Sequence, residues 1–287
     1  MASRFWVGGT GTWDASDTTH WAASSGGAGG QSVPGSSDTV TLDASSGGGT
    51  VTVNYGVGGT VTVSTITMGA FTGTLDFAAN DNNVNVKTFS GTGTGVRTLN
   101  MGDGTWTFVD GSGTGNVSWD FTTTTNLTFA CNASVMVFTP SGSNPTATLS
   151  WGTLAATYNS ITLNGSSTGS LFDLSVAVSA TIATLSVTGK STLVLRATGP
   201  ATYTITTLSI VGTQTNQIAI LASNTGGRPI ISVASGTPTL TWLSWIYLIA
   251  FSGGATFNAT NSQNAGTGSS TGITVVPPTF GGGIISG

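Results

Sequence analysis

The sequence predicts an all-β protein, and more narrowly a right-handed parallel β-helix (β-solenoid) with a cap at each end. Only 6% of the 287 residues are charged, and all ten acidic residues are Asp, so common helix formers are scarce. Forty-three Gly residues, with many Ser and Asn, supply turns. The hydrophobic fraction of 38%, with eight Trp and twelve Phe, argues against a disordered chain.

Apolar residues alternate with polar ones in short pieces, which is the period of a β-strand. Val51 and Val53 flank Thr52, and Ile218 and Ile220 flank Ala219. No segment keeps a helical spacing over ten residues. Branched Val, Ile and Thr side chains pack well on a pleated surface, so these pieces are predicted to be strands.

A short signature recurs, in which hydroxyl and aliphatic residues alternate and a Gly follows. It covers residues 65–69, 160–165, 184–189 and 207–212. From Ile161 to Leu185 is 24 residues and from Leu185 to Leu208 is 23, while Ile66 lies 95 residues before Ile161, close to four such steps. Three strands of about 4–5 residues with short turns fill one coil of this size, so the spacing predicts stacked coils.

We divide the chain into an N-terminal cap or attachment region (1–45), a solenoid body (46–250) and a C-terminal cap with an extended tail (251–287). Strand-like pieces between residues 70 and 145 do not fit one repeat. That stretch is expected to hold either irregular coils or a small inserted sheet.

Two segments resemble known proteins. The first is Phe5-Trp6-Val7-Gly8-Gly9-Thr10-Gly11-Thr12-Trp13-Asp14 with the later pairs His20-Trp21 and Val33-Pro34 and the triplet Asp38-Thr39-Val40. It resembles the opening coil of many bacteriophage structural proteins and of bacterial β-solenoid adhesins. The second, Gly253 to Asn258 followed by Asn261-Ser262 and Thr271-Gly272-Ile273, is similar to the closing coil of the same group.

The resemblance implies a virion protein with a β-helical body. The group includes tail fibres, tailspikes, head fibres and capsid decoration proteins. We expect a capsid decoration (cement) or head-fibre protein on the outer surface of the virion. The alternatives are a tail fibre, tailspike or adhesin-type receptor-binding module and, less favoured, a polysaccharide-degrading enzyme. The start, Met1 to Gly9, lacks a signal-peptide pattern, so we expect synthesis in the host cytoplasm.

No catalytic, cofactor-binding or metal-binding residue is predicted. The nearest carboxylate groupings are Asp14 with Asp17, and Asp103, Asp110 and Asp120; their surroundings are typical of Asp that caps a turn. The single histidine, His20, is expected to be structural, and the single cysteine, Cys131, is expected to be buried. We therefore expect no enzyme and no cofactor.

Large aromatic residues gather near both ends. Trp6, Trp13 and Trp21 are expected to plug the N-terminal end of the coil. The candidate subunit or partner interface consists of Trp242, Trp245, Tyr247, Phe280, Ile284 and Ile285.

The expected partners are further copies of the chain, as a homotrimer, and phage capsid or tail proteins, while a host surface glycan is left open. No nucleic acid or membrane is expected, because the net charge is −4 and no basic stretch is present. The most apolar stretch, Leu240 to Phe251, is too short and too often interrupted to cross a bilayer.

Thr-x-Thr pairs occur at residues 60–62, 65–67, 105–107 and 202–204. Stacked regularly on one flat face, such pairs would indicate an ice-binding solenoid. In the sequence they do not recur at coil spacing, which favours an ordinary solvated strand face.

Overall fold

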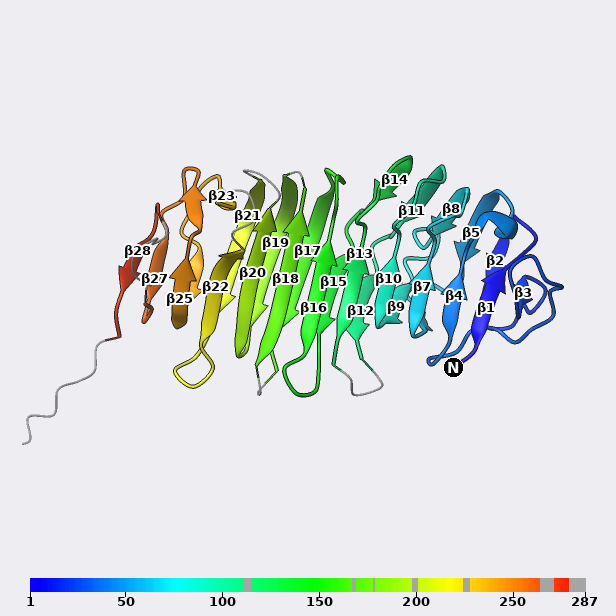
Figure 1. Ribbon diagram of the computed structural model, residues 1–287, viewed down its shortest axis with the longest axis horizontal. Helices are drawn as coiled ribbons and strands as arrows, with labels where there is room; N and C mark the ends of the chain where they lie inside the picture. The colour runs from blue at the N-terminus through cyan, green and yellow to red at the C-terminus, as the bar shows by residue number, and fades with distance from the viewer. Residues whose placement is uncertain are drawn as a thin grey trace, which may run out of the picture.

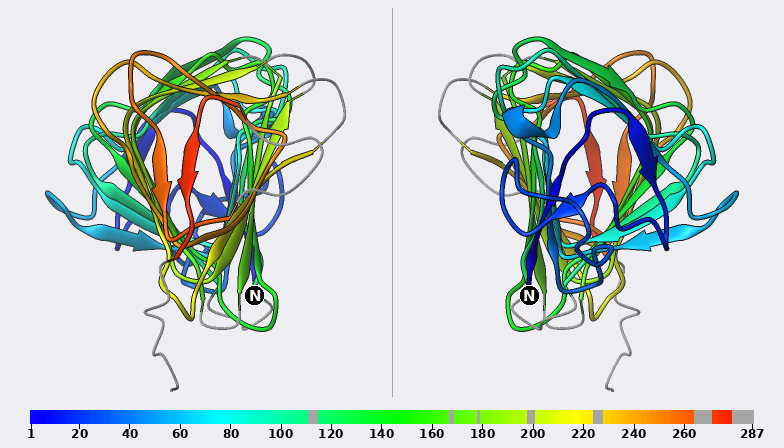
Figure 2. Two further views of the ribbon diagram at one scale, coloured as in Figure 1. Left: turned by 90° about the vertical axis from the view of Figure 1, so that its left-hand side faces the viewer. Right: turned by 90° about the vertical axis from the view of Figure 1, so that its right-hand side faces the viewer.

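The computed structural model describes residues 1–110, 115–166, 169–177, 179–197, 201–223, 228–263 and 271–278. Over these residues the chain winds into an elongated right-handed coil whose walls are three long sheets, A, B and C (Figures 1 and 2). The predicted parallel β-helix is confirmed. The described residues include one short 3-10 helix, η1 (Ala44–Ser46), and none of their helices is long and apolar enough to cross a membrane.

Sheet A runs the length of the coil and contains eleven strands. All of its pairs are parallel except the pair of β1 with β3. Its strands, in chain order, are β1 (Ser3–Trp6), β3 (Trp21–Ala22), β4 (Thr39–Thr41), β7 (Thr65–Thr67), β10 (Thr88–Ser90), β13 (Val117–Asp120), β16 (Thr146–Ser150), β18 (Ser170–Val176), β20 (Ser191–Ala197), β22 (Ile218–Ser223) and β25 (Leu243–Tyr247).

Sheet B has five strands and belongs to the N-terminal half of the coil. They are β2 (Gly11–Trp13), β5 (Gly49–Val53), β8 (Gly73–Asp76), β11 (Arg97–Asn100) and β14 (Leu127–Ala130).

Sheet C is a twelve-stranded sheet in which β21 pairs with β23 through its first half and with β24 through its second. Its strands are β6 (Thr60–Thr62), β9 (Asn83–Val86), β12 (Thr105–Val109), β15 (Val135–Thr139), β17 (Thr157–Asn164), β19 (Ala180–Thr188), β21 (Thr202–Val211), β23 (Ile230–Val233), β24 (Thr239–Thr241), β26 (Ala250–Ser252), β27 (Asn258–Thr260) and β28 (Thr274–Val276).

The core is a set of ladders in which each inward side chain lies above its partner in the previous coil. Along sheet A one buried ladder is Val40, Ile66, Phe89, Trp119, Leu149, Leu174 and Leu195. In sheet C, Phe108 stacks on its register partner Phe138 with ring centroids 4.3 Å apart. Burial of these large side chains, at ~25 cal/mol per Å² of apolar surface, is the main favourable contribution to folding.

The register confirms part of the predicted repeat and corrects another part. Ile161, Leu185 and Leu208 pair directly in sheet C. Ile66 was placed in the same series, and this was wrong, because it pairs with Val40 in sheet A.

The stretch from residue 70 to 145 forms continuous coils rather than an inserted sheet, within the residues that the structure describes. Successive coils there differ in length. The hydrogen bond between Thr105 and Asn83 spans 22 residues, whereas the bond between Ser118 and Thr88 spans 30. A fixed repeat therefore cannot be phased through it.

The four Thr-x-Thr pairs noted in the sequence do not pair with one another, because residues 65–67 lie in sheet A and the other three pairs lie on separate strands of sheet C. A fifth pair, Thr39 and Thr41, does lie directly beside Thr65 and Thr67. This outward row continues as Thr88 and Ser90, as Ser118 with the carboxylate Asp120, and as Thr148 and Ser150. Some hydroxyls bond across coils: Ser118 Oγ lies 3.2 Å from Thr88 Oγ1. These side chains are partly exposed, as expected of a solvated strand face.

The N-terminal aromatic residues form the predicted buried plug. Trp6, Trp13 and Trp21 are each fully buried and contact one another edge to face. His20 stacks on Trp6, and its Nδ1 lies 2.8 Å from the carbonyl oxygen of Val7. Loops of the blue segment lie across this end of the coil in Figure 2 (right).

The boundaries at residues 45 and 250 stay a prediction. Strands β1 and β2, from the segment before residue 45, already pair with β4 and β5 of the predicted body. The winding therefore starts inside the segment assigned to the cap.

A buried cation, Arg97, ties two coils together. Its side chain is 1% exposed and donates hydrogen bonds to the carbonyl oxygens of Gly91 and Gly95 in its own coil and of Thr123 and Thr125 in the next. Burial lowers the pKa of Arg97. Carbonyl dipoles thus stabilise a charge that would otherwise be costly inside the coil.

We expect Arg97→Met to lower the free energy of unfolding by roughly 3 kcal/mol or more, because it leaves buried carbonyl groups without a donor. Denaturant unfolding followed by circular dichroism measures this. Arg4→Met is the matched control, since Arg4 bonds Ser32 at an exposed site, and should change the stability by about 0.5 kcal/mol or less. Equal losses in the two variants would contradict the role assigned to Arg97.

The N-terminal end is predicted to loosen in acid. Backbone hydrogen bonds from Asp17 and Ser16 lower the pKa of Asp14 below its usual value. At Asp38 burial acts to raise the pKa, but hydrogen bonds from the amides of Gly35 and Ala2 outweigh it and the pKa is lowered. Groups with a lowered folded-state pKa stabilise the protein above their unfolded value, and this contribution is lost as pH falls through and below about 4.

Pepsin digestion at pH 3, with cleavage sites mapped by mass spectrometry, checks this acid effect. Early cuts are expected within residues 1–45 of the wild-type chain and later cuts within residues 146–197. Asp14→Asn should show the early cuts with less dependence on pH, because asparagine has no carboxylate for acid to protonate. Simultaneous cleavage along the whole coil would refute the idea.

Candidate functional site

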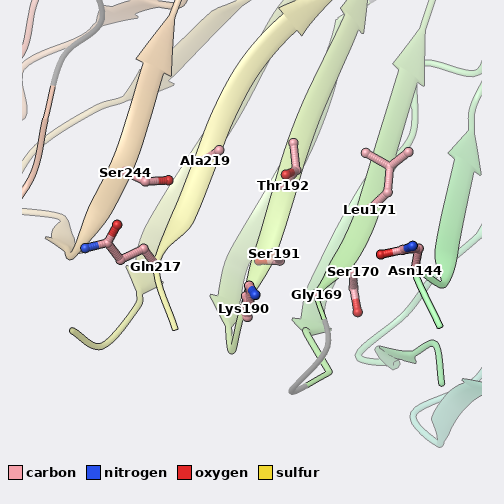
Figure 3. A pocket seen from close by; sticks show the side chains of 10 residues that line it. All are labelled: Asn144, Gly169, Ser170, Leu171, Lys190, Ser191, Thr192, Gln217, Ala219 and Ser244. Carbon is pink, nitrogen blue, oxygen red and sulfur yellow. The ribbon is translucent and has the colours of Figure 1, made fainter. Parts of the chain in front are cut away.

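A surface hollow lies on the outer face of sheet A, toward the C-terminal end of the coil. It is an open groove of about 350 Å³ across the beginnings of β18, β20, β22 and β25 (Figure 3). The residues that line it are Asn144, Gly169, Ser170, Leu171, Lys190, Ser191, Thr192, Gln217, Ala219 and Ser244.

Part of the floor of the groove is one row of paired residues, Leu171, Thr192 and Ala219, on three neighbouring strands. Residues paired in this way project from the same face of a parallel sheet. Trp245 pairs with Ala219 and continues the row on β25, so its exposed ring lies beside the groove, outside the lining.

A β-bulge sets the direction of Trp245. Ile218 pairs with Leu243, but the next residue, Ala219, pairs with Trp245, so Ser244 is the extra residue. If the strand alternated strictly through Ser244, with no bulge, Trp245 would face inward. The bulge instead leaves Trp245 outside, with its side chain 55% exposed, and lets Ser244 line the groove. Bulges often re-aim side chains next to functional sites.

Strand β25 is also bounded by unusual backbone. Trp242, just before it, and Leu248, just after it, have φ values of 54° and 57°. The left-handed region is unfavourable for bulky residues, at a cost on the order of 1–3 kcal/mol each. Hydrogen bonds hold this geometry: the Trp242 amide donates to the Thr260 carbonyl, and the Ile218 amide donates to the Trp242 carbonyl. Such strain is often found at functional sites.

Lys190 is the charged residue among the ten that line the groove. Further along the same face, Arg196 and Asp173 form an ion pair, with 2.6 Å between Arg196 Nε and Asp173 Oδ1. The hydrogen bond that Arg196 donates to Asp173 raises the pKa of Arg196. Because Asp173 is engaged with Arg196, the charge presented by the groove lining is positive.

A buried hydroxyl without a protein partner lies behind the groove. Ser191 is 5% exposed, and among the described residues no group forms a hydrogen bond with its Oγ. Ser170, one coil earlier, differs, because its hydroxyl bonds Ser166. Ser191 pairs with the core residue Ile218, so its side chain faces the inside of the coil and not the groove.

The predicted interface residues are only partly brought together. Trp245 and Tyr247 project from the outer face of β25, and Trp242 lies in the turn before it. Phe280, Ile284 and Ile285 lie outside the described residues. Their role as an interface stays a prediction.

The Asp groupings noted in the sequence take structural roles. Asp14 accepts hydrogen bonds from the amides of Ser16 and Asp17, and Asp120 accepts one from Thr122, as expected of turn caps. Asp17 bonds the Thr19 amide in the same way, and Asp103 bonds the amide of Ala133 in the next coil.

Asp110 adds an interaction that the sequence did not reveal. Its buried carboxylate lies 3.3 Å from Lys87 Nζ and also accepts a hydrogen bond from the amide of Gly115. Cys131 is buried as predicted, and burial raises the pKa of its thiol. Across the described residues, no three His, Cys, Asp or Glu side chains gather closely enough to hold a metal ion.

Sequence reasoning missed the polar residues of the groove. Lys190 and Gln217 each stand immediately before a strand of sheet A, one coil apart, because Ser191 pairs with Ile218. Correct alignment of these coils would have placed them together. No repeat found in the sequence provided that alignment, since the recurring signature follows sheet C.

Trp245 is predicted to carry most of the tryptophan fluorescence that a neutral quencher can reach. Six other tryptophans, Trp6, Trp13, Trp21, Trp106, Trp119 and Trp151, are fully buried. Trp245→Phe should therefore remove most of the acrylamide-quenched signal and leave the melting temperature nearly unchanged. Trp119→Phe, in the core, should keep the quenched signal but lower the melting temperature. Unchanged quenching in Trp245→Phe would refute the outward orientation.

Comparison with known proteins adds no relative from which a function could be carried over. No family model, curated protein or solved structure matches this chain.

Proposed function

We propose that this chain is a structural protein on the outer surface of a bacteriophage particle, acting as a capsid decoration or head-fibre protein. In this proposal it is made in the host cytoplasm, assembles as a homotrimer and contacts phage capsid proteins. It works through its shape and stiffness, without a catalytic step.

The observation that carries the proposal is the uninterrupted stacking of parallel strands along sheet A. Strands from β1 to β25 follow one another in register, each hydrogen-bonded to the coil before and after it. A coil held in this way resists bending and leaves few free backbone groups along its walls. Stiffness and resistance to proteolysis are useful properties on the outside of a particle.

The use of the carboxylates also supports a structural role. Every one of the ten Asp side chains accepts a hydrogen bond or forms an ion pair within the coil. Five of them are described above with the candidate site. The other five are Asp38, Asp43, Asp76, Asp81 and Asp173. Sugar-cleaving enzymes need a pair of carboxyl groups that face the substrate, so this distribution favours a structural protein over a polysaccharide-degrading enzyme.

The two segments that resemble phage proteins build the two ends of the coil. The opening segment supplies β1, β2 and the buried tryptophan plug. In the closing segment, the buried hydroxyl of Ser262 accepts a hydrogen bond from the Leu243 amide and donates one to the Thr260 carbonyl. Each segment therefore has a structural task at an end of the coil.

The open edges favour self-association. Within the described residues β25 is the last strand of sheet A and β28 the last of sheet C. Edge strands present unpaired backbone groups, and association of copies is one common way to cover them.

Cryo-electron microscopy of particles, with gold-labelled antibody against this chain, tests the proposal. We expect label on the capsid shell and three-fold rods at the labelled positions. Antibody against a known major capsid protein is the positive control. Label found only at the tail tip, or free of particles altogether, would contradict the decoration or head-fibre role.

A further inference from the structure

We propose that the groove on sheet A binds an acidic oligosaccharide, with Trp245 stacked on one sugar ring and Lys190 paired with a carboxylate of the ligand. This inference concerns a binding site and does not depend on where the chain resides on a particle.

The exposed ring of Trp245 is the first argument. Its neighbours in the same row are Leu171, Thr192 and Ala219, whereas at this position a tryptophan is 55% exposed and is turned outward by the bulge at Ser244. The face of an aromatic ring carries negative charge density and attracts the C–H groups on the apolar face of a sugar. A flat ring beside an open groove is suited to that contact.

The polar lining is the second argument. Asn144 lies at one end of the groove and Gln217 and Ser244 lie at the other, with Thr192 between them (Figure 3). The two amides each carry both donors and acceptors, and Thr192 and Ser244 add hydroxyls. Sugar hydroxyls also donate and accept, so they match such a mixed set. An apolar peptide or lipid would leave these groups unsatisfied.

The positive charge of Lys190 in the groove favours an acidic saccharide over a neutral one. The whole chain has a net charge of −4, yet the groove lining contains Lys190 and no carboxylate. Asp173, on the same face, is held by Arg196. A carboxylated sugar is therefore attracted to this part of an otherwise negative molecule, and the attraction should weaken with salt.

Binding is measured with the full-length protein on a glycan array that contains neutral oligosaccharides and oligosaccharides carrying uronic or sialic acid carboxylates. Isothermal titration then gives affinities for the acidic hits at low and high salt. We expect saturable binding of carboxylated glycans, weakened at high salt. Trp245→Ala should weaken binding by roughly tenfold or more. Lys190→Gln should weaken only the acidic glycans.

Two control variants lie outside the groove. Val57→Ala removes a side chain that is 88% exposed, and Arg4→Gln removes an exposed cation near the N-terminus; neither should change binding. All variants should melt at the wild-type temperature, since the altered side chains are surface residues.

Three outcomes would overturn the proposal. The first is no binding to any glycan on the array. The second is equal binding of neutral and acidic glycans that Lys190→Gln does not affect. The third is a dissociated oligomer in Trp245→Ala without glycan binding in the wild type, which would identify this surface as a contact between copies. Particle labelling reports separately on the virion role, so the two proposals can fail independently.

Discussion

Backbone hydrogen bonding between successive coils is the constraint that the rest of the structure obeys. Neighbouring parallel strands lie about 4.8 Å apart, so each inward side chain must fit directly over the one in the coil before. The ladder from Val40 to Leu195 and the stacked pair Phe108 and Phe138 follow from this rule. Since each coil touches mainly its neighbours, stability accumulates coil by coil, and the two ends need their own solutions.

The sparse charge of the chain is explained by where the charges are used. Asp side chains accept hydrogen bonds from backbone amides in turns, and Arg97 donates to carbonyl oxygens of two coils. The charged side chains therefore satisfy backbone groups at the corners, where strand pairing stops. On the walls, outward positions carry hydroxyls, which bond water or one another without repulsion between stacked rows. The groove beside Trp245 departs from this pattern, and for that reason it stands out as a site.

The architecture could be predicted from the sequence because alternation and turn residues report local structure directly. The series Ile161, Leu185 and Leu208 was found because those coils have nearly equal lengths. Ile66 was misplaced because different faces carry similar motifs, and counting residues cannot identify the face when one coil step covers 22 residues and another covers 30. The groove escaped prediction since it depends on register between coils and on the bulge at Ser244. Trp245 was named as a candidate interface residue from its place in an aromatic cluster, but its outward direction could not be deduced without the bulge.

The variable coil length has a consequence for how such a molecule can change. Between Thr88 and Ser118 the chain covers 30 residues and still returns to register, so the extra length is accommodated at a corner while the strands on either side remain paired. Loop closure becomes only slowly more costly as a loop lengthens. Corner loops can therefore gain or lose residues with little penalty, and new surface chemistry can evolve at one coil while the inner packing of its neighbours stays as it was.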